Sequence, residues 1–278
     1  AALRRAGFAP AAAGGMSFMV RMPEDEAGRR KTPIVFVHGV GVGLVTYLKL
    51  ITEIASWDAP VVCLELPYVS MRPGPPPPAI EEHVGAVVAM LDKLGFGRAH
   101  LIGHSYGSLV LSWMVKHAPH RVAGAAFVDP VTFMLHLPKV LHSFLYHKGA
   151  PTFQVSDLVG SELFLNRALR RHFVWHRNIC FCSEMQEQNI PTLVVLSEKD
   201  EIVPSADVDR HVREHQEREH QRGVVESFVL EGANHGQVLF DDALHQTLSR
   251  QLRLHWTRVD DAAAAGNSAA AAAAAAAA

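Results

Sequence analysis

Short apolar runs recur along the chain and alternate with stretches in which apolar and polar residues follow a helical period. Ile34–Val37 and Val122–Val128 are apolar at nearly every position, and Thr192–Ser197 carries a continuous apolar run between its terminal Thr and Ser; such runs are typical of strands buried on both faces of a parallel sheet. Leu44–Ile54 and Ile80–Leu94 carry apolar residues at helical spacing. Strands that alternate with helices predict an α/β fold with a doubly wound, mostly parallel sheet. We expect further strands at residues 61–67, 100–102 and 224–230, and further helices at residues 109–118, 206–221 and 238–256.

Residues 131–190 interrupt this alternation, because no unit of strand and helix is visible there. They contain apolar, aromatic and histidine-rich pieces, among them Phe133, Phe144, Phe173 and Trp175. We predict a helical cap inserted after the sixth strand. A cap this apolar packs against the main domain, and part of it can also line a pocket.

The pattern divides the chain into three parts. Residues 1–30 are expected to form a flexible N-terminal segment, 31–260 the α/β domain with its cap, and 261–278 a low-complexity, alanine-rich tail. The first 15 residues, with two arginines and no acid, fit a remnant of an organelle transit peptide as well as an arbitrary cut from a longer product. The proline-rich residues 73–78 indicate a stiff connecting loop rather than a ligand for a proline-binding module.

The charge balance limits the classes of partner. With 26 basic and 28 acidic residues the net charge is −2, so we expect no surface for nucleic acid or anionic lipid. The 17 histidines lack a tight ligand spacing, so we predict no metal and no cofactor. No apolar run reaches the roughly 18 to 20 residues of a membrane span, and the oligomeric state is not determined by the sequence.

The cysteines bear on the compartment. Cys63, Cys180 and Cys182 are odd in number and form a poor disulfide framework, which favours a reducing, intracellular setting, cytoplasmic or organellar. No second pair completes a metal or redox site with Cys180 and Cys182. We therefore expect these two side chains to pack in the cap.

One stretch carries a motif with a chemical meaning. Gly103-His104-Ser105-Tyr106-Gly107 lies between a predicted strand and a predicted helix. In that setting G-x-S-x-G forms a nucleophile elbow, a strained turn that exposes the serine hydroxyl. Gly103 and Gly107 are needed where strand and helix cross too closely for a Cβ. An ordinary glycine-rich turn is the alternative interpretation.

Two further residues complete a candidate constellation for nucleophilic catalysis. A serine hydroxyl needs a base within hydrogen-bond reach, and a carboxylate must orient that base. The chain supplies Ser105, Asp200 and His235 in this order, each just past the predicted carboxyl end of a strand. Open parallel sheets bind their ligands at that edge. Asp129, after the preceding strand, is the alternative acid, and Asp200 has the alternative role of capping the next helix.

This order and these settings resemble the α/β-hydrolase superfamily over about Thr32 to Trp256. The motifs that carry the resemblance are His38-Gly39 after the first long strand, residues 103–107 at the elbow, 197–200 after the penultimate strand, and 232–235 after the last.

The resemblance implies a role for each motif residue. Ser105 would be the nucleophile, His235 the general base and then acid, and Asp200 the carboxylate that holds the imidazole. Asp200 is preferred over Asp129 because an acid followed by residues such as Ile202-Val203-Pro204 is the commoner family arrangement. The remaining implied roles are an oxyanion hole from the backbone N–H groups of Val40 and Tyr106, a structural hydrogen-bonding role for His38 beneath the oxyanion loop, and packing of His104 beside the nucleophile.

The chain departs from some branches of the superfamily. The loop after the first long strand reads His-Gly-Val-Gly, so the esterase branch with His-Gly-Gly-Gly is not supported. A serine at the elbow argues against the epoxide hydrolase and haloalkane dehalogenase branches, which use an aspartate.

These features predict an esterase- or lipase-like serine hydrolase. We expect a small hydrophobic carboxylic ester, thioester or lactone as substrate, cleaved through an acyl-enzyme. The alternatives are an acyltransferase with the same triad, a non-catalytic binding protein on this fold, and a peptidase that acts on small N-terminal residues.

Overall fold

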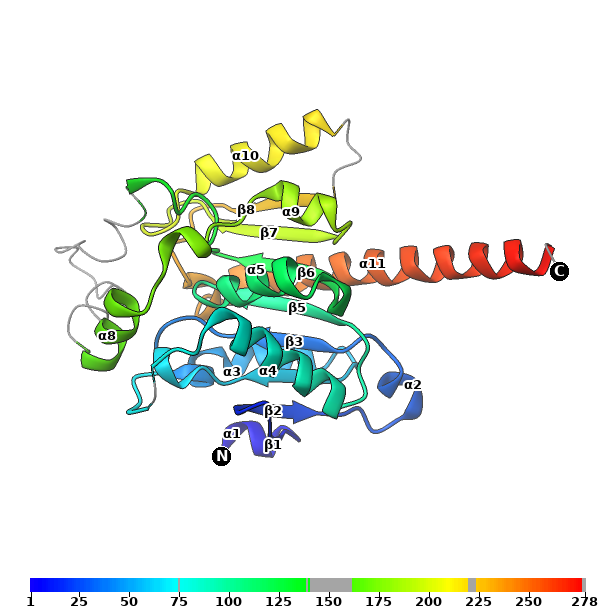
Figure 1. Ribbon diagram of the computed structural model, residues 1–278, viewed down its shortest axis with the longest axis horizontal. Coiled ribbons are helices and arrows are strands. Elements are labelled where there is room, and N and C mark those ends of the chain that lie inside the picture. Colours follow the sequence, from blue (N-terminus) through cyan, green and yellow to red (C-terminus); the bar gives the residue numbers. More distant parts are fainter. Residues whose placement is uncertain (75, 139, 141–161, 220–223, 277–278) are drawn as a thin grey trace.

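An eight-stranded sheet forms the centre of the molecule (Figure 1). The computed structural model describes all residues except 75, 139, 141–161, 220–223 and 277–278. The strand order is β1-β2-β4-β3-β5-β6-β7-β8. Neighbours from β4 onward pair in parallel, whereas β2 pairs antiparallel with both β1 and β4. The strands are β1 (Ala9–Ala13), β2 (Met16–Arg21), β3 (Ile34–Val37), β4 (Val61–Leu64), β5 (Ala99–His104), β6 (Val122–Val128), β7 (Thr192–Ser197) and β8 (Val225–Leu230).

Helices cover both faces of the sheet. On one face lie α1 (Ala2–Arg5), α3 (Leu48–Ala55) and α11 (Asp242–Ala276); on the other lie α4 (Ile80–Lys93), α5 (Gly107–His117), α9 (Cys182–Glu187) and α10 (Ser205–Arg218). The predicted doubly wound α/β fold is therefore confirmed. The remaining helical segments are α2 (Glu26–Arg29), α8 (Leu163–Arg171), η1 (Gly43–Tyr47), η2 (Pro67–Val69), η3 (Pro119–Arg121), η4 (Trp175–Arg177) and η5 (Gln237–Leu239).

The continuous apolarity of the central strands follows from this layering. In β3, Val35 and Val37 point into one core cluster, and Ile34 and Phe36 point into the other. All four side chains are buried. A strand with a core on each side has no polar face, so its sequence shows no alternation.

The N-terminal 30 residues differ from the flexible segment expected above. β1 and β2 form an antiparallel hairpin that extends the sheet beyond β4. Gly14 and Gly15 connect the strands, both with positive φ (56° and 79°), as a tight two-residue hairpin turn requires. The hairpin was missed because Ala9–Ala13 consists of alanine and proline, which give no strand pattern.

The predicted cap is described only in part. Between β6 and β7 the described residues include α8, η4 and α9, while 139 and 141–161 lie outside the described residues. Cys180 and Cys182 are buried, free thiols, and burial raises the pKa of the Cys182 thiol to about 12. The cap as a unit stays a prediction.

The final helix is longer than its amphipathic pattern indicated. α11 begins at Asp242 rather than at residue 238 and continues through the alanine-rich stretch to Ala276. Figure 1 shows this end projecting away from the sheet. Of the helices in the described part of the chain, none combines the length and apolarity that crossing a membrane requires.

Candidate active site

Ser105 lies in a strained turn between β5 and α5. Its φ is +52°, a left-handed conformation that is unfavourable for residues with a side chain. Its N–H donates to Val128 O at 2.9 Å, which ties the turn to the neighbouring strand. Ser105 is 3% exposed. The sequence prediction of a sharp turn at this residue agrees with the backbone.

The elbow glycines are required by close packing. A Cβ on Gly107 would lie 2.3 Å from Val37 O, and one on Gly103 would lie 2.7 Å from Gly107 O. Both obstacles are backbone atoms, which cannot rotate away. The strand and the helix can therefore cross here only with glycine at both positions.

We expect Gly107→Ala to lower the free energy of unfolding by about 3 kcal/mol, because the added methyl group must push β3 and α5 apart. Gly85→Ala is the matched control. A Cβ on Gly85, inside α4, meets nothing within 4 Å, so this change should raise the free energy of unfolding by roughly 0.5 to 1 kcal/mol. Urea denaturation measures both. Equal effects of the two substitutions would contradict this account of the elbow.

Ser105, His235 and Asp200 meet at the carboxyl ends of β5, β8 and β7. His235 Nε2 lies 3.0 Å from Ser105 Oγ, and His235 Nδ1 lies 2.6 Å from Asp200 Oδ2. The N–H groups of Ile202 and Val203 both donate to Asp200 Oδ1 at 2.8 Å. Oδ2 of Asp200 thus holds the imidazole, while Oδ1 of Asp200 is held by N–H groups of the loop that follows β7. The structure brings these three predicted residues together.

Two opposing influences act on the pKa of His235. Burial lowers the pKa, whereas the charge and hydrogen bond of Asp200 and the charges of Asp129 and Glu201 raise it, with a net rise to about 9. His104, which also faces His235 with its ring centroid 5.5 Å away, has its own pKa lowered by burial. The imidazolium form of His235 is accordingly stabilised by its anionic neighbours.

Asp129 lies beside this group but does not contact the His235 ring by a hydrogen bond. Its carboxylate accepts from Ser197 N at 2.8 Å, from Ser197 Oγ at 3.0 Å and from Gly236 N at 2.9 Å. Asp129 therefore holds the loop that carries His235. Burial by itself raises the pKa of Asp129. The His104 and His235 side chains and the Gly236 N–H together lower this pKa by more than burial raises it, so the net shift is downward.

A chain of hydrogen bonds supports the elbow from below. Gly39 N–H donates to Tyr47 Oη at 2.9 Å, and Tyr47 Oη lies 2.8 Å from His104 Nδ1. His104 Nε2 faces Asp129 Oδ2 at 3.7 Å, so the tautomer with the proton on Nε2 fits these neighbours best. Tyr47 was not singled out in the sequence, because nothing in its helical pattern distinguishes it from a core residue.

His38 holds the loop after β3 rather than contacting Ser105. Leu66 N–H donates to His38 Nε2 at 3.0 Å, which leaves the proton on Nδ1 to donate to Gly39 O at 2.7 Å. Burial lowers the pKa of His38 to about 4, so the ring is neutral. These two hydrogen bonds join the loop after β3 to the segment after β4.

The loop after β3 passes close over the nucleophile. A Cβ on Gly39 would lie 2.9 Å from Ser105 Cβ. The N–H of Gly41 donates to Val69 O at 3.0 Å, whereas the N–H groups of Val40 and Tyr106 donate to no other group in the described part of the chain. Two unused donors beside a serine are what an oxyanion hole needs, so Val40 and Tyr106 remain the candidates.

The same acids and imidazole are spaced closely enough to suggest a metal ion. Ligand atoms of Asp129, Asp200 and His235 lie within 4.8 Å of one another. However, the oxygens of Asp129 and Asp200 and both nitrogens of His235 already take part in the hydrogen bonds described above. A metal would have to break that network, so this donor set does not fit a resident ion.

Comparisons with known proteins identify the fold family of the chain. The model of the α/β hydrolase fold family matches residues 32–178. The chain is 32% identical over 115 residues to the dihydrolipoyllysine-residue acetyltransferase component of the acetoin cleaving system of Cupriavidus necator, a match that covers 41% of this chain and 30% of that protein. The matched segment thus spans about a third of that relative.

Solved structures show the same fold at low sequence identity. A serine hydrolase from Cycloclasticus zankles has a TM-score of 0.62 and 13% identity, covering 90% of this chain and 97% of the other. Naproxen esterase from Bacillus subtilis has a TM-score of 0.57 and 15% identity, covering 91% and 95%. With a family model that matches more than half of its residues, the chain belongs to the α/β hydrolase fold family.

Proposed function

We propose that this protein is a serine hydrolase that cleaves carboxylic esters through an acyl-enzyme on Ser105. The observation that carries the proposal is the unbroken hydrogen-bond chain from Ser105 Oγ to His235 and on to Asp200, with distances of 3.0 and 2.6 Å. A nucleophile, a base and an orienting carboxylate in this geometry activate a hydroxyl that is otherwise unreactive at neutral pH.

The reaction follows from the positions of the three side chains. Neutral His235 takes the Ser105 proton at Nε2 as Oγ attacks the ester carbonyl. The oxyanion that forms accepts hydrogen bonds from the N–H groups of Val40 and Tyr106, each worth about 3 kcal/mol in the transition state. His235 then gives the proton to the leaving alcohol. A water molecule, deprotonated by His235, attacks the acyl-enzyme and releases the acid and free Ser105.

This mechanism predicts an alkaline pH dependence. The base must be neutral, and the pKa of His235 is raised from 6.5 to about 9. We therefore expect kcat/KM for a neutral ester to increase with pH up to about pH 9, because the neutral fraction of His235 increases over this range. The pH profile of kcat/KM measures this. A plateau already reached at pH 7 would show that the anionic neighbours do not hold the proton on His235.

The hydrophobic character proposed for the substrate is supported by aromatic side chains beside the nucleophile. The ring of Tyr106, the residue after Ser105, lies 6.1 Å from the Tyr68 ring and 6.3 Å from the Phe173 ring. Apolar walls with few polar groups are usual in small-molecule sites.

A panel of p-nitrophenyl esters of increasing acyl length tests the proposed function. We expect hydrolysis with a chain-length optimum, and its loss in Ser105→Ala and His235→Ala. Activity that persists unchanged in both variants would refute the mechanism.

A second candidate is acyl transfer, in which an alcohol or a thiol replaces water in the second half of the reaction. The partial match to an acetyltransferase component favours this candidate. The two reactions share the acyl-enzyme, so kinetics on esters do not distinguish them. Product analysis with and without an added acceptor does: a new ester or thioester formed in preference to the free acid would establish transfer.

A further inference from the structure

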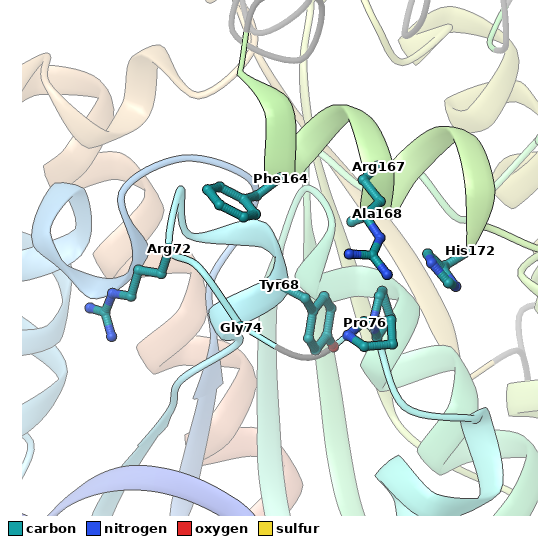
Figure 2. Close-up of a pocket in the computed structure, with 9 residues that line it drawn as sticks. Tyr68, Arg72, Gly74, Pro76, Phe164, Arg167, Ala168 and His172 are labelled. Carbon is teal, nitrogen blue, oxygen red and sulfur yellow. The ribbon is translucent and has the colours of Figure 1, made fainter.

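A small pocket lies between α8 and the chain that follows β4 (Figure 2). Its volume is about 20 Å³, enough for one small polar group. α8 packs against η2 here, so the walls come from two segments about 100 residues apart in the sequence. The residues that line it include Tyr68, Arg72, Pro76, Phe164, Arg167 and His172.

The pocket is basic, and none of the described residues that line it is acidic. Figure 2 shows the Arg167 side chain extending from α8 toward the loop at Pro76, with His172 on the same side. Arg72 turns away from them in this view and pairs with Glu65, with Nη1 and Oε2 3.0 Å apart. Arg167 forms no ion pair with another residue that the structure describes. Its guanidinium therefore offers its charge and its donors to a ligand.

One aromatic residue connects this pocket to the nucleophile. Tyr68 lines the pocket, and its ring lies 6.1 Å from that of Tyr106, the residue after Ser105. To place its far end beside Arg167, a substrate that reacts at Ser105 would have to pass the rings of Tyr106 and Tyr68, which are 4% and 7% exposed. That end must be small, because the pocket is small.

We propose that this pocket binds a carboxylate at the end of the substrate remote from the ester, with Arg167 as its main partner and His172 as a second donor. The inference rests on the proposed ester hydrolysis and adds a substrate class: monoesters of dicarboxylic acids. The guanidinium presents donors in a planar fork that matches a carboxylate. Phe164 and Tyr68 supply apolar contacts for the methylene chain between the two ends.

Matched pairs of esters test this subsite kinetically. Mono-p-nitrophenyl adipate is compared with p-nitrophenyl hexanoate, and mono-p-nitrophenyl suberate with p-nitrophenyl octanoate. The two esters of each pair have the same chain length and differ only at the far end, which is a carboxylate in one and a methyl group in the other. We expect Arg167→Gln to lower kcat/KM for the anionic esters by about 10-fold and to leave that for the neutral esters unchanged. Arg167→Lys should retain part of the preference, because it keeps the charge but not the fork.

Arg171→Gln is the control, because it removes the same charge from the same helix but Arg171 does not line the pocket. Arg171→Gln should leave kcat/KM unchanged for both the anionic and the neutral ester of each pair. If Arg167→Gln lowered kcat/KM equally for the anionic and the neutral esters, or did not lower it at all, the proposed subsite would be overturned while ester hydrolysis would stand.

A binding measurement separates failure of the subsite from failure of the proposed function. Calorimetry of monomethyl adipate with Ser105→Ala needs no turnover. We expect the double variant Ser105→Ala, Arg167→Gln to bind about 10-fold more weakly than Ser105→Ala. Equal affinity of the two proteins would overturn the carboxylate site, whether or not the wild-type protein hydrolyses esters.

Discussion

Replacing Ser105 by alanine is expected to lower kcat on p-nitrophenyl esters by roughly 10⁴- to 10⁶-fold. In the proposed mechanism the hydroxyl oxygen forms the acyl-enzyme, and it lies 3.0 Å from His235 Nε2. Alanine keeps the Cβ and the backbone bond to Val128 O, so the fold should persist. His235→Ala should lower kcat by a similar factor, because Ser105 and His235 act as one unit in the reaction.

Ser112→Ala is the matched control for the first prediction. Ser112 lies on the same helix, α5, and is also fully buried, but no hydrogen bond joins it to the triad. We expect its kcat to stay within about twofold of the wild type. Circular dichroism and stopped assays on all three proteins separate loss of folding from loss of chemistry. If folded Ser105→Ala protein kept most of the wild-type activity, Ser105 would not be the nucleophile.

The second large effect is expected for Asp200→Asn, with a loss of about 10³- to 10⁴-fold in kcat. Asp200 Oδ2 accepts from His235 Nδ1 at 2.6 Å, and an amide there favours the wrong tautomer of the imidazole. It also fails to stabilise the imidazolium that forms during attack. The backbone donors at Ile202 and Val203 can still bind the side-chain oxygen, so the loop should keep its conformation.

Asp129→Asn is the comparison that distinguishes the two candidate acids. This carboxylate accepts from Ser197 and Gly236 rather than from the imidazole, so we expect a loss of about 10-fold or less at the optimum pH. Removal of its charge should lower the pKa of His235, since Asp129 helps to raise it, and the rise of kcat/KM should move to lower pH. A larger loss in Asp129→Asn than in Asp200→Asn would exchange the roles of the two acids.

Much of this site follows from local sequence. The continuous apolarity of Ile34–Val37 and Thr192–Ser197 predicted strands with the bounds that the structure has. The glycines at 103 and 107 predicted the close crossing that the contact distances describe. These features were predictable because each depends on a pattern of adjacent residues.

Other features depend on contacts between distant segments and could not be predicted. Asp129 and Asp200 both follow a strand, so the local sequence left both acids open, and the preference for Asp200 came from the family resemblance; the packing of the loops decides which acid reaches His235. Tyr47 lies in an ordinary helical pattern, and its hydroxyl meets His104 only because η1 packs beneath the elbow. Arg167 belongs to a stretch with no strand-and-helix rhythm, so nothing in the sequence relates it to Tyr68.

The most direct test of the central claim is mass-spectrometric mapping after incubation with a fluorophosphonate, which modifies serines activated by an adjacent base. We predict one adduct per chain, on Ser105, which does not form in His235→Ala. A folded protein that takes up no label, or takes it up on another residue, would contradict the assignment of Ser105 as an activated nucleophile.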